Sequence, residues 1–425
     1  MHLSKFGKKI TKYSGILELM DDLGKAMSGK EKMIMLGGGN PAHIPEMQEL
    51  FRKRTKEILS NSKEFENLIS NYDIPRGNIE FLEEFASFLK KEFNWNVTSK
   101  NIAVTGGSQL GFFILFNILA GEMPNGKRKK ILLPLAPEYI GYADQGIDED
   151  LFVSCKPKIE LIDEHTFKYH IDFDKLEITK DIAAICISRP TNPTGNVVTG
   201  NEMDKLIMLA NKNKTSLIVD NAYGKPFPNV MFADSKLEWN DNIIHSFSLS
   251  KLGLPTSRTG IIVAREEIIE ALSRANAIIS LANSGIGQSL IKPLLKGNKI
   301  IKICEKYITP FYAKRSKQAR KLIYKYFDSS LPYYIHMNEG TFFLWLWFKD
   351  IPVKTMEIYN RLKKRKVIVV PGEYFFPGIK DNKWKHIGEC IRINYASASE
   401  KDVEEGIRII ADEVKKAYSA KMPKA

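Results

Sequence analysis

The feature that most constrains this chain is a repeated alternation of short apolar runs with longer amphipathic stretches after residue 100. The apolar runs are too short for helices and are hydrophobic on both faces, which is typical of strands covered on both sides. Amphipathic stretches such as "NEMDKLIMLANKNK" separate several of them. The alternation predicts an α/β domain with a mostly parallel, seven-stranded sheet between helix layers. The predicted strands span residues 101–104, 130–134, 150–155, 183–188, 216–220, 243–248 and 260–264.

The pattern changes after about residue 300. A long helical stretch, roughly Leu290 to Phe327, leads to the strand-like runs "FFLWLWFKD", "VIVVPG" and "CIRINYA" and to a final amphipathic helix from about Glu400. This order predicts a second, smaller α+β domain. The first 45 or so residues show no sheet of their own, so we expect them to pack onto it. We therefore predict a large domain at 46–319 and a small domain formed by 1–45 and 320–425.

Composition places the chain among ordinary globular proteins, with 44% hydrophobic and 27% charged residues in a length of 425. The longest apolar stretch, residues 111–121, is interrupted by Asn117 and is shorter than the roughly 20 residues that a membrane span needs. No apolar segment of secretory type follows the basic N-terminus. We therefore expect no membrane association and a cytoplasmic location.

The four cysteines stand far apart in the sequence and have no metal-ligand or redox spacing. We expect reduced thiols and no metal site. The net charge of +13 raises the question of a nucleic-acid partner. However, the lysines alternate with acidic residues and no aromatic-interleaved RNA motif is present, so solvated lysine-rich helices are the favoured interpretation. A positive surface would also attract anionic substrates and cofactors.

Polar residues stand at the ends of several predicted strands, where ligands bind in open α/β sheets. Lys251, in "SLSKLGLPTSR", follows the strand 243–248, and a buried ammonium is costly unless it is paired, neutralised or chemically used. Asp220 ends the strand "SLIVD", and Asn192 lies in "SRPTNPTGN" after another strand. The strand 101–104 runs into the turn Gly106–Ser108, whose backbone N–H groups could bind a phosphate at a helix N-terminus.

Each of these features also has a plain structural explanation. Glycine turns between strands and helices are common, Asp220 could cap a helix, and the loop around Asn192 needs no function of its own. Together, however, the residues match the requirements of pyridoxal phosphate. This cofactor needs a lysine for its aldehyde, a carboxylate for its ring nitrogen, donors for its phenolic oxygen, a phosphate site and a flat residue over the ring. The candidates in that order are Lys251, Asp220, Asn192 with Tyr223, the turn Gly106–Ser108 with Ser248 and Arg258, and Tyr139.

The motifs "NPTG", "DNAY" and "SLSKLGLPTSRTG" resemble those of the class I/II pyridoxal-phosphate aminotransferases of fold type I, and the resemblance covers nearly the whole chain. It implies that Lys251 forms the internal aldimine and that Asp220 binds the pyridine nitrogen. It further implies that Asn192 and Tyr223 bind the phenolic oxygen and that Tyr139 stacks on the ring. The phosphate would be held by Gly107, Ser108, Ser248 and Arg258.

The resemblance also assigns the substrate side of the site. Arg392, in "CIRINYA", would hold the substrate α-carboxylate together with Asn192, and Gly39 would bring its backbone close to that carboxylate. Tyr72, in "NYDIPRG", would reach the phosphate of a neighbouring subunit, which implies a homodimer with shared active sites. Many relatives have a glycine where this chain has Thr256, so we expect an altered turn before Arg258.

Longer motifs, such as "MLGGGNPAHIPEM" and "PLAPEYIGYADQG", resemble the members of this family that exchange an amino group between valine and pyruvate. The implied reaction, a step of amino-acid biosynthesis, converts valine and pyruvate to 3-methyl-2-oxobutanoate and alanine with ping-pong kinetics. Lys251, Asp220 and Tyr223 would be the catalytic residues. The alternatives are an aminotransferase of other specificity, a C–S β-lyase, or a cofactor-binding transcription regulator. A regulator would need an added DNA-binding segment, for which the residues before 100 leave little room.

Overall fold

Each of the seven apolar runs forms a strand of one sheet in the computed structural model, which describes residues 2–12, 14–27, 33–381 and 383–420. With the short strand β3 they make an eight-stranded sheet of order β2-β11-β10-β9-β8-β4-β3, in which β5 pairs with β4. The strands are β2 (Ile102–Thr105), β3 (Gly121–Glu122), β4 (Arg128–Leu133), β5 (Phe152–Ser154), β8 (Ile182–Ser188), β9 (Ser216–Asp220), β10 (Ile243–Ser248) and β11 (Gly260–Val263).

Six of the seven predicted strands run in the same direction. β8, β9 and β10 pair in parallel, as do β4 with β8 and with β5. β11 is antiparallel to both of its neighbours, β10 and β2, so it alone among the seven is reversed. The prediction of a mostly parallel α/β sheet is confirmed.

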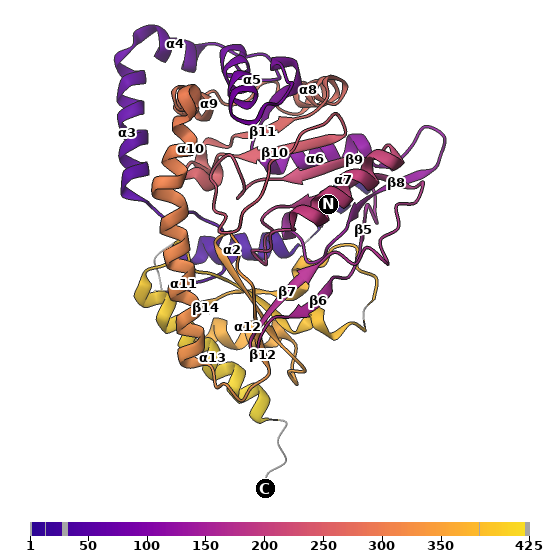
Figure 1. Ribbon diagram of the computed structural model, residues 1–425, viewed down its shortest axis with the longest axis vertical. Coiled ribbons are helices and arrows are strands. Elements are labelled where there is room, and N and C mark those ends of the chain that lie inside the picture. Colours follow the sequence, from indigo (N-terminus) through magenta and orange to yellow (C-terminus); the bar gives the residue numbers. More distant parts are fainter. Residues whose placement is uncertain (1, 13, 28–32, 382, 421–425) are drawn as a thin grey trace.

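Helices cover both faces of this sheet because its strands are apolar on both faces. Ile218, Ile244 and Ile262 pack on one side in a core with residues of α6 and α8, whereas Leu217 and Val219 pack on the other with residues of α7. Figure 1 shows this layered half in the upper part of the molecule. The helices of this half are α3 (Pro45–Ser60), α4 (Ser62–Ser70), α5 (Ile79–Phe93), α6 (Ser108–Leu119), α7 (Gly200–Asn213), α8 (Glu266–Ser280), α9 (Ile286–Leu295) and α10 (Lys299–Ile303).

A second sheet of six strands, in the order β15-β16-β13-β12-β7-β6, forms the lower half of Figure 1. Its strands are β6 (Lys158–Leu161), β7 (Thr166–His170), β12 (Tyr333–His336), β13 (Phe343–Phe348), β15 (Val370–Pro371) and β16 (Cys390–Asn394). The remaining helices are α1 (Lys5–Ile10), α2 (Gly15–Met27), α11 (Thr309–Tyr326), α12 (Thr355–Lys364) and α13 (Glu400–Ser419).

The N-terminal segment joins the C-terminal part of the chain, since β1 (Ile34–Met35) pairs in parallel with β14 (Val367–Ile368). The hairpin β6–β7 lies within the range 46–319 but pairs with β12, and α11 runs without a break across residue 319. The boundaries of the two domains therefore remain a prediction.

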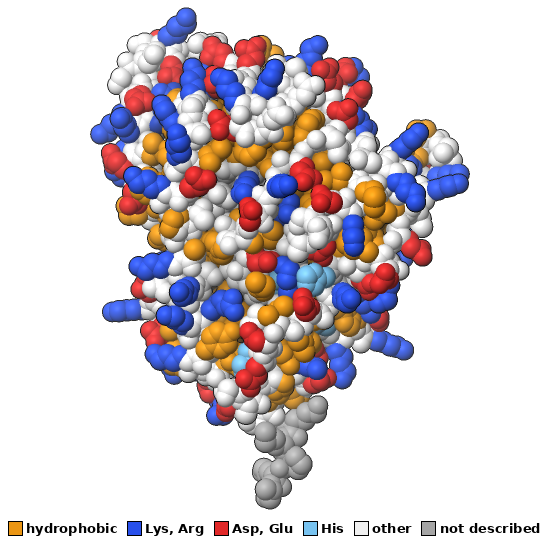
Figure 2. All heavy atoms as spheres, in the orientation of Figure 1, with side chains coloured by type: hydrophobic (Ala, Val, Ile, Leu, Met, Phe, Trp, Pro, Cys, Tyr) orange, Lys and Arg blue, Asp and Glu red, His pale blue; other side chains and the backbone are white. Residues whose placement is uncertain are grey.

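The surface carries both signs of charge, and Figure 2 shows lysines and arginines interspersed with carboxylates across the face in view. None of the helices in the described part of the chain has the length and apolar character required to span a membrane.

Candidate active site

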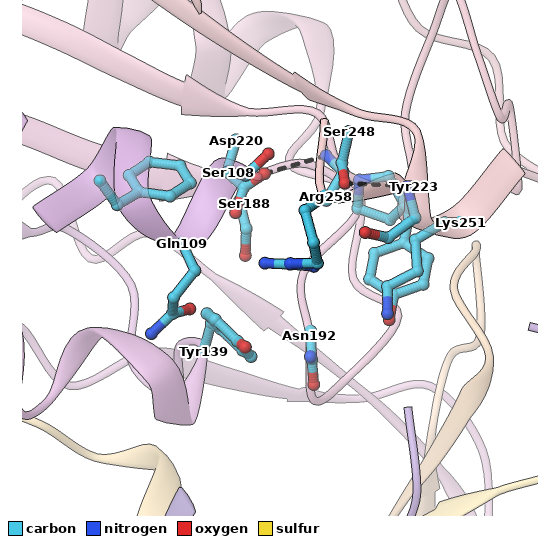
Figure 3. Close-up of a pocket in the computed structure, with 14 residues that line it drawn as sticks. Ser108, Gln109, Tyr139, Ser188, Asn192, Asp220, Tyr223, Ser248, Lys251 and Arg258 are labelled. Carbon is cyan, nitrogen blue, oxygen red and sulfur yellow. Dashed lines mark hydrogen bonds between the residues drawn. The ribbon is translucent and has the colours of Figure 1, made fainter. Parts of the chain in front are cut away.

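A cavity of about 140 Å³ opens at the carboxyl ends of the parallel strands, and it is lined by residues from segments far apart in the sequence. Parallel strands bring their carboxyl ends to one edge of the sheet, which is why the polar residues after β8, β9 and β10 meet there. Figure 3 shows their side chains around one space. The lining residues are Ser108, Gln109, Phe112, Tyr139, Ser188, Pro190, Asn192, Asp220, Ala222, Tyr223, Ser248, Ser250, Lys251 and Arg258.

Lys251 lies at this cavity in the short helix η3 (Ser250–Leu252), directly after β10. Its Nζ donates a hydrogen bond of 2.7 Å to the carbonyl oxygen of Gly39 and lies 5.5 Å from the centre of the Tyr223 ring. Burial lowers the pKa of Lys251 to about 8, and the positive charges of Arg392 and Arg258 act in the same direction. About a tenth of the amine is therefore unprotonated at pH 7, far more than for an ordinary lysine, as a nucleophile or a base requires.

Asp220 is buried at the end of β9 and is held by two donors. The hydroxyl of Tyr142 donates to its Oδ2 at 2.7 Å, and the backbone N–H of Ala222 donates to its Oδ1 at 2.9 Å. Burial raises the pKa of Asp220 to about 6, against the effect of these hydrogen bonds and of Lys251. Such a carboxylate can hold a proton on a heterocyclic nitrogen brought next to it.

The turn before α6 and the segment around Arg258 form a candidate anion site. Gly107 has a φ of 90°, and a Cβ there would collide with the Arg258 guanidinium, so glycine is required for this close approach. Ser108 opens α6, where backbone N–H groups have no helical partner. Arg258 is exposed at the cavity, and Ser248 lies on the adjacent wall. Thr256 sits in the 3₁₀ turn η4 (Pro255–Ser257), which leads into a left-handed backbone at Arg258.

Three further predicted ligands surround the same space. Tyr139 lines the cavity, and a Cβ at Gly141 would collide with its ring. Asn192 and Tyr223 are both buried, and the Tyr223 hydroxyl has no hydrogen-bond partner among the described residues. A buried hydroxyl without a partner is costly, which indicates that a bound group completes its hydrogen bonding.

Arg392 lies on β16 next to this cavity and is buried. Its guanidinium donates to Oδ1 of Asn192 at 2.9 Å and to the carbonyl oxygen of Gly37 at 2.6 Å. The Phe343 ring lies 4.0 Å from its Cζ, and its Nε has no partner among the described residues. The carbonyls of Gly37 and Gly39 thus face the arginine and the lysine that the sequence assigned to substrate and cofactor.

Tyr72 is the one predicted site residue that does not lie near this cavity in the single chain. It is 85% exposed and lines a separate groove with residues of α4, α9 and the segment before α9. Its predicted role needs a second subunit, so the single chain does not test it.

Several residues of the site were missed by sequence reasoning. Gln109, Phe112, Ser188 and Ser250 line the cavity without having been predicted. Tyr142 was missed although it holds Asp220, because nothing in the sequence pairs positions 78 residues apart. Ser188 ends a predicted strand and Ser250 directly precedes Lys251, so their places at strand ends could have identified them.

The donor set fits pyridoxal phosphate. The cavity offers one amine with a lowered pKa, one buried carboxylate, an unpartnered tyrosine hydroxyl and an anion site. These are the groups that an aldehyde, a pyridine nitrogen, a phenolic oxygen and a phosphate ester require.

Comparisons with known proteins agree with this geometry. The family model "Aminotransferase class I and II" matches residues 31–410. Valine–pyruvate aminotransferase from Escherichia coli is 48% identical over 419 residues, which is 99% of both chains. A crystal structure of a putative amino-acid aminotransferase from Psychrobacter arcticum has a TM-score of 0.95 and 43% identity, covering 99% of this chain and 100% of that one. Valine-pyruvate aminotransferase from Salmonella typhimurium has a TM-score of 0.87 and 46% identity, covering 95% and 99%.

Proposed function

This chain belongs to the class I and II aminotransferases, and we propose that it transfers the amino group of valine to pyruvate. It is a pyridoxal-phosphate enzyme, and this cofactor supplies an aldehyde for amines and an electron-accepting ring. The observation that carries the choice of substrates is the 48% identity to valine–pyruvate aminotransferase over 99% of the chain. Amino-acid biosynthesis in the cytoplasm is the setting that we propose for this reaction.

Different residues of the chain contribute to different parts of the transamination reaction. Lys251 would hold the cofactor through its amine and, as a free amine, would act as the base at the substrate Cα. The carbonyl of Gly39, 2.7 Å from Nζ, fixes the amine while it is free. Asp220 would keep a proton on the ring nitrogen of a bound cofactor, and Tyr142 orients Asp220 through its hydrogen bond. Tyr139, Asn192, Tyr223 and the anion site keep the cofactor in one orientation.

The surroundings of Arg392 support an aliphatic substrate. The planar guanidinium suits a carboxylate, because two parallel N–H donors match its two oxygens. The rings of Phe343 and Phe375 lie 4.0 Å and 5.2 Å from its Cζ, so the carboxylate site is bordered by apolar surface. Among the described residues, the cavity and the Arg392 site contain no second arginine placed for a side-chain carboxylate, since Arg258 lies at the anion site. An acidic amino acid therefore has no obvious partner here.

We also propose a homodimer in which Tyr72 reaches the phosphate of the partner subunit. Support comes from the exposed apolar side chains near its groove, which single chains rarely leave in such number. They include Ile69, Tyr72, Ile278, Leu281 and Ile286, each more than half exposed. The four cysteines of the chain are free, which fits a reducing compartment.

The test is a panel of amino donors with pyruvate as acceptor, following alanine and the 2-oxo acid produced. We expect valine to give the highest kcat/KM, with isoleucine and 2-aminobutyrate lower, because one methylene changes binding by only about 1–3 kcal/mol. Preference for aspartate or an aromatic donor would contradict the proposal. Release of pyruvate and ammonia from a cysteine conjugate, without amino transfer, would identify a C–S lyase instead.

A further inference from the structure

Glu138 is a buried carboxyl that the reaction described above leaves unused. It has no exposed surface and stands between β4 and η2 (Ile140–Tyr142), one residue before Tyr139. None of the hydrogen bonds to its carboxyl comes from a lysine, arginine or histidine in the described part of the chain. A carboxyl in such a place is stable only if it is neutral or held by strong donors.

The contacts of Glu138 connect two walls of the cavity. Its Oε1 accepts a hydrogen bond of 2.8 Å from the backbone N–H of Ser188, and its Oε2 lies 2.5 Å from Ser188 Oγ. The backbone N–H of Tyr139 donates to Oε2 at 3.2 Å. The backbone N–H of Glu138 itself donates to the carbonyl of Phe375, whose ring faces Arg392. One side chain therefore fixes both Ser188 and the loop that carries Tyr139.

Asp220 is a second buried carboxyl on the strand next to Ser188. Ser188 is the register partner of Asp220 in the parallel ladder of β8 and β9. Burial raises the pKa of Glu138 to about 8, and Asp220 adds to this effect, while the donors from Ser188 and Tyr139 oppose it. The other titratable groups at this wall are Tyr142 and Cys186, whose pKa values are also raised by burial. Near neutral pH, Asp220 is mostly ionised and Glu138 mostly protonated.

The protonation of Glu138 sets the direction of the Ser188 hydroxyl. A protonated Glu138 donates to Ser188 Oγ and leaves the serine hydrogen free to point into the cavity. An ionised Glu138 is only an acceptor, so it would take that hydrogen for itself. Ionisation would also place a second negative charge beside Asp220.

We propose that Glu138 is a positioning residue that works as a neutral acid. It turns the Ser188 hydroxyl toward the bound cofactor and leaves Asp220 as the negative charge at the ring nitrogen. This inference rests on the proposed function, because it concerns the same cofactor site.

The test compares Glu138→Gln and Ser188→Ala with the unaltered holoenzyme. Glutamine reproduces the neutral acid toward Ser188, since its carbonyl can accept from the Ser188 N–H while its amide donates to Ser188 Oγ; only the weaker bond from the Tyr139 N–H is lost. We expect Glu138→Gln to keep kcat within about threefold at pH 7. Ser188→Ala should lower kcat by about tenfold, because it removes the proposed hydrogen bond to the cofactor. The absorbance of bound cofactor should show a transition near pH 8 in the unaltered enzyme that is missing in Glu138→Gln.

Two results would overturn the inference. One is a loss of kcat well beyond tenfold in Glu138→Gln at an unchanged melting temperature, which would mean that the carboxylate is required. The other is the same pH transition in the unaltered enzyme and in Glu138→Gln. It would overturn the inference even if Glu138→Gln lowered the melting temperature, because Glu138 would then act only on stability. Failure of the proposed function would look different, because a chain that binds no pyridoxal phosphate gives no cofactor absorbance to titrate.

Discussion

At the scale of single residues, the site depends on placing an amine in a buried position without losing its reactivity. Burial and two nearby arginines bring the pKa of Lys251 to about 8, from an ordinary value of 10.5. The hydrogen bond to Gly39 gives the amine a fixed acceptor in place of water. This environment suits Lys251 to the role of nucleophile and base near neutral pH that we propose for it.

Lys251→Ala should abolish transamination. We expect a loss of at least about 1,000-fold in kcat, because both the covalent anchor and the proton-transfer base are removed. Cofactor should still bind through the remaining ligands but should leave on dialysis. Lys175→Ala is the matched control, since the Lys175 side chain is 82% exposed and does not line the cavity. Turnover of the Lys251 variant close to that of the control would refute the assignment.

The rate at which cofactor-free protein captures pyridoxal phosphate should depend on pH in a defined way. Only the unprotonated amine attacks the aldehyde, so below a pKa of about 8 the rate should fall with falling pH and above it should level off. Stopped-flow absorbance measures this rate directly. Removing the charge in Arg392→Leu should move the midpoint to higher pH, because Arg392 lowers the pKa of Lys251. A midpoint near the ordinary lysine value in the unaltered protein would contradict this description.

Arg392→Lys should retain less affinity for the substrate carboxylate than its positive charge alone would suggest. A lysine keeps the positive charge but cannot offer two parallel donors to a carboxylate or replace the contact with Phe343. We expect KM for both valine and pyruvate to rise by about tenfold or more with a smaller change in kcat, and Arg392→Ala to be worse. Steady-state kinetics with each substrate separates these effects. Equal affinities in all three proteins would exclude a carboxylate role for Arg392.

At the scale of secondary-structure elements, the strands of the large sheet were predictable, whereas one exposed hairpin and one interruption of a helix were not. All seven runs that the sequence marked as strands are strands, because residues apolar on both faces suit a sheet covered on both sides. The hairpin β6–β7 escaped prediction, since both strands are short and mix polar with apolar residues, and Lys158–Leu161 is largely exposed. The helical stretch after Leu290 was predicted as continuous but turns at Gly297, which has a φ of 63°.

Helix α7 gives a prediction at this scale, because it joins the two strands that end at Ser188 and Asp220. Thr199 Oγ accepts a hydrogen bond from the Glu202 N–H at 3.3 Å, and Glu202 Oε2 accepts one from the Thr199 N–H at 2.9 Å. This reciprocal cap satisfies two N–H groups that have no helical partner. Thr199→Ala should lower the free energy of unfolding by about 1 kcal/mol.

Denaturant unfolding measures that loss, and Thr199→Ser is the control, because serine keeps the capping hydroxyl. Steady-state kinetics should be nearly unchanged in both variants, since Thr199 does not line the cavity. A stability of Thr199→Ala equal to that of Thr199→Ser would show that the cap contributes nothing.

At the scale of the whole molecule, the site is assembled from segments that the sequence separates widely. Arg392 and Asn192 are 200 residues apart and hydrogen-bonded, and Lys251 contacts Gly39 across 212 residues. The second sheet brings Arg392 to the edge of the first, so that the residues proposed for substrate and for cofactor binding meet there. The proposed dimer adds Tyr72, which lines a groove separate from the cavity of its own chain.

The dimer gives a further prediction. Ile278→Asp places a charge on an apolar side chain that is 88% exposed near the Tyr72 groove, so it should produce monomers with weakened affinity for pyridoxal phosphate. Light scattering gives the mass and cofactor titration gives the affinity. Ile162→Asp is the control, because Ile162 is also exposed, at 46%, but follows the remote strand β6. An unchanged dimer in Ile278→Asp would place the interface elsewhere.

The sequence by itself determined the α/β sheet, the polar strand ends and the chemistry of a pyridoxal-phosphate site. It could do so because apolar runs, turns and motif residues are properties of neighbouring positions. Only the tertiary structure decided that Tyr142 holds Asp220, that Gly39 faces Lys251 and that Glu138 lies buried beside Ser188. Burial and long-range contacts create those relations, and they shift pKa values that no local pattern can predict.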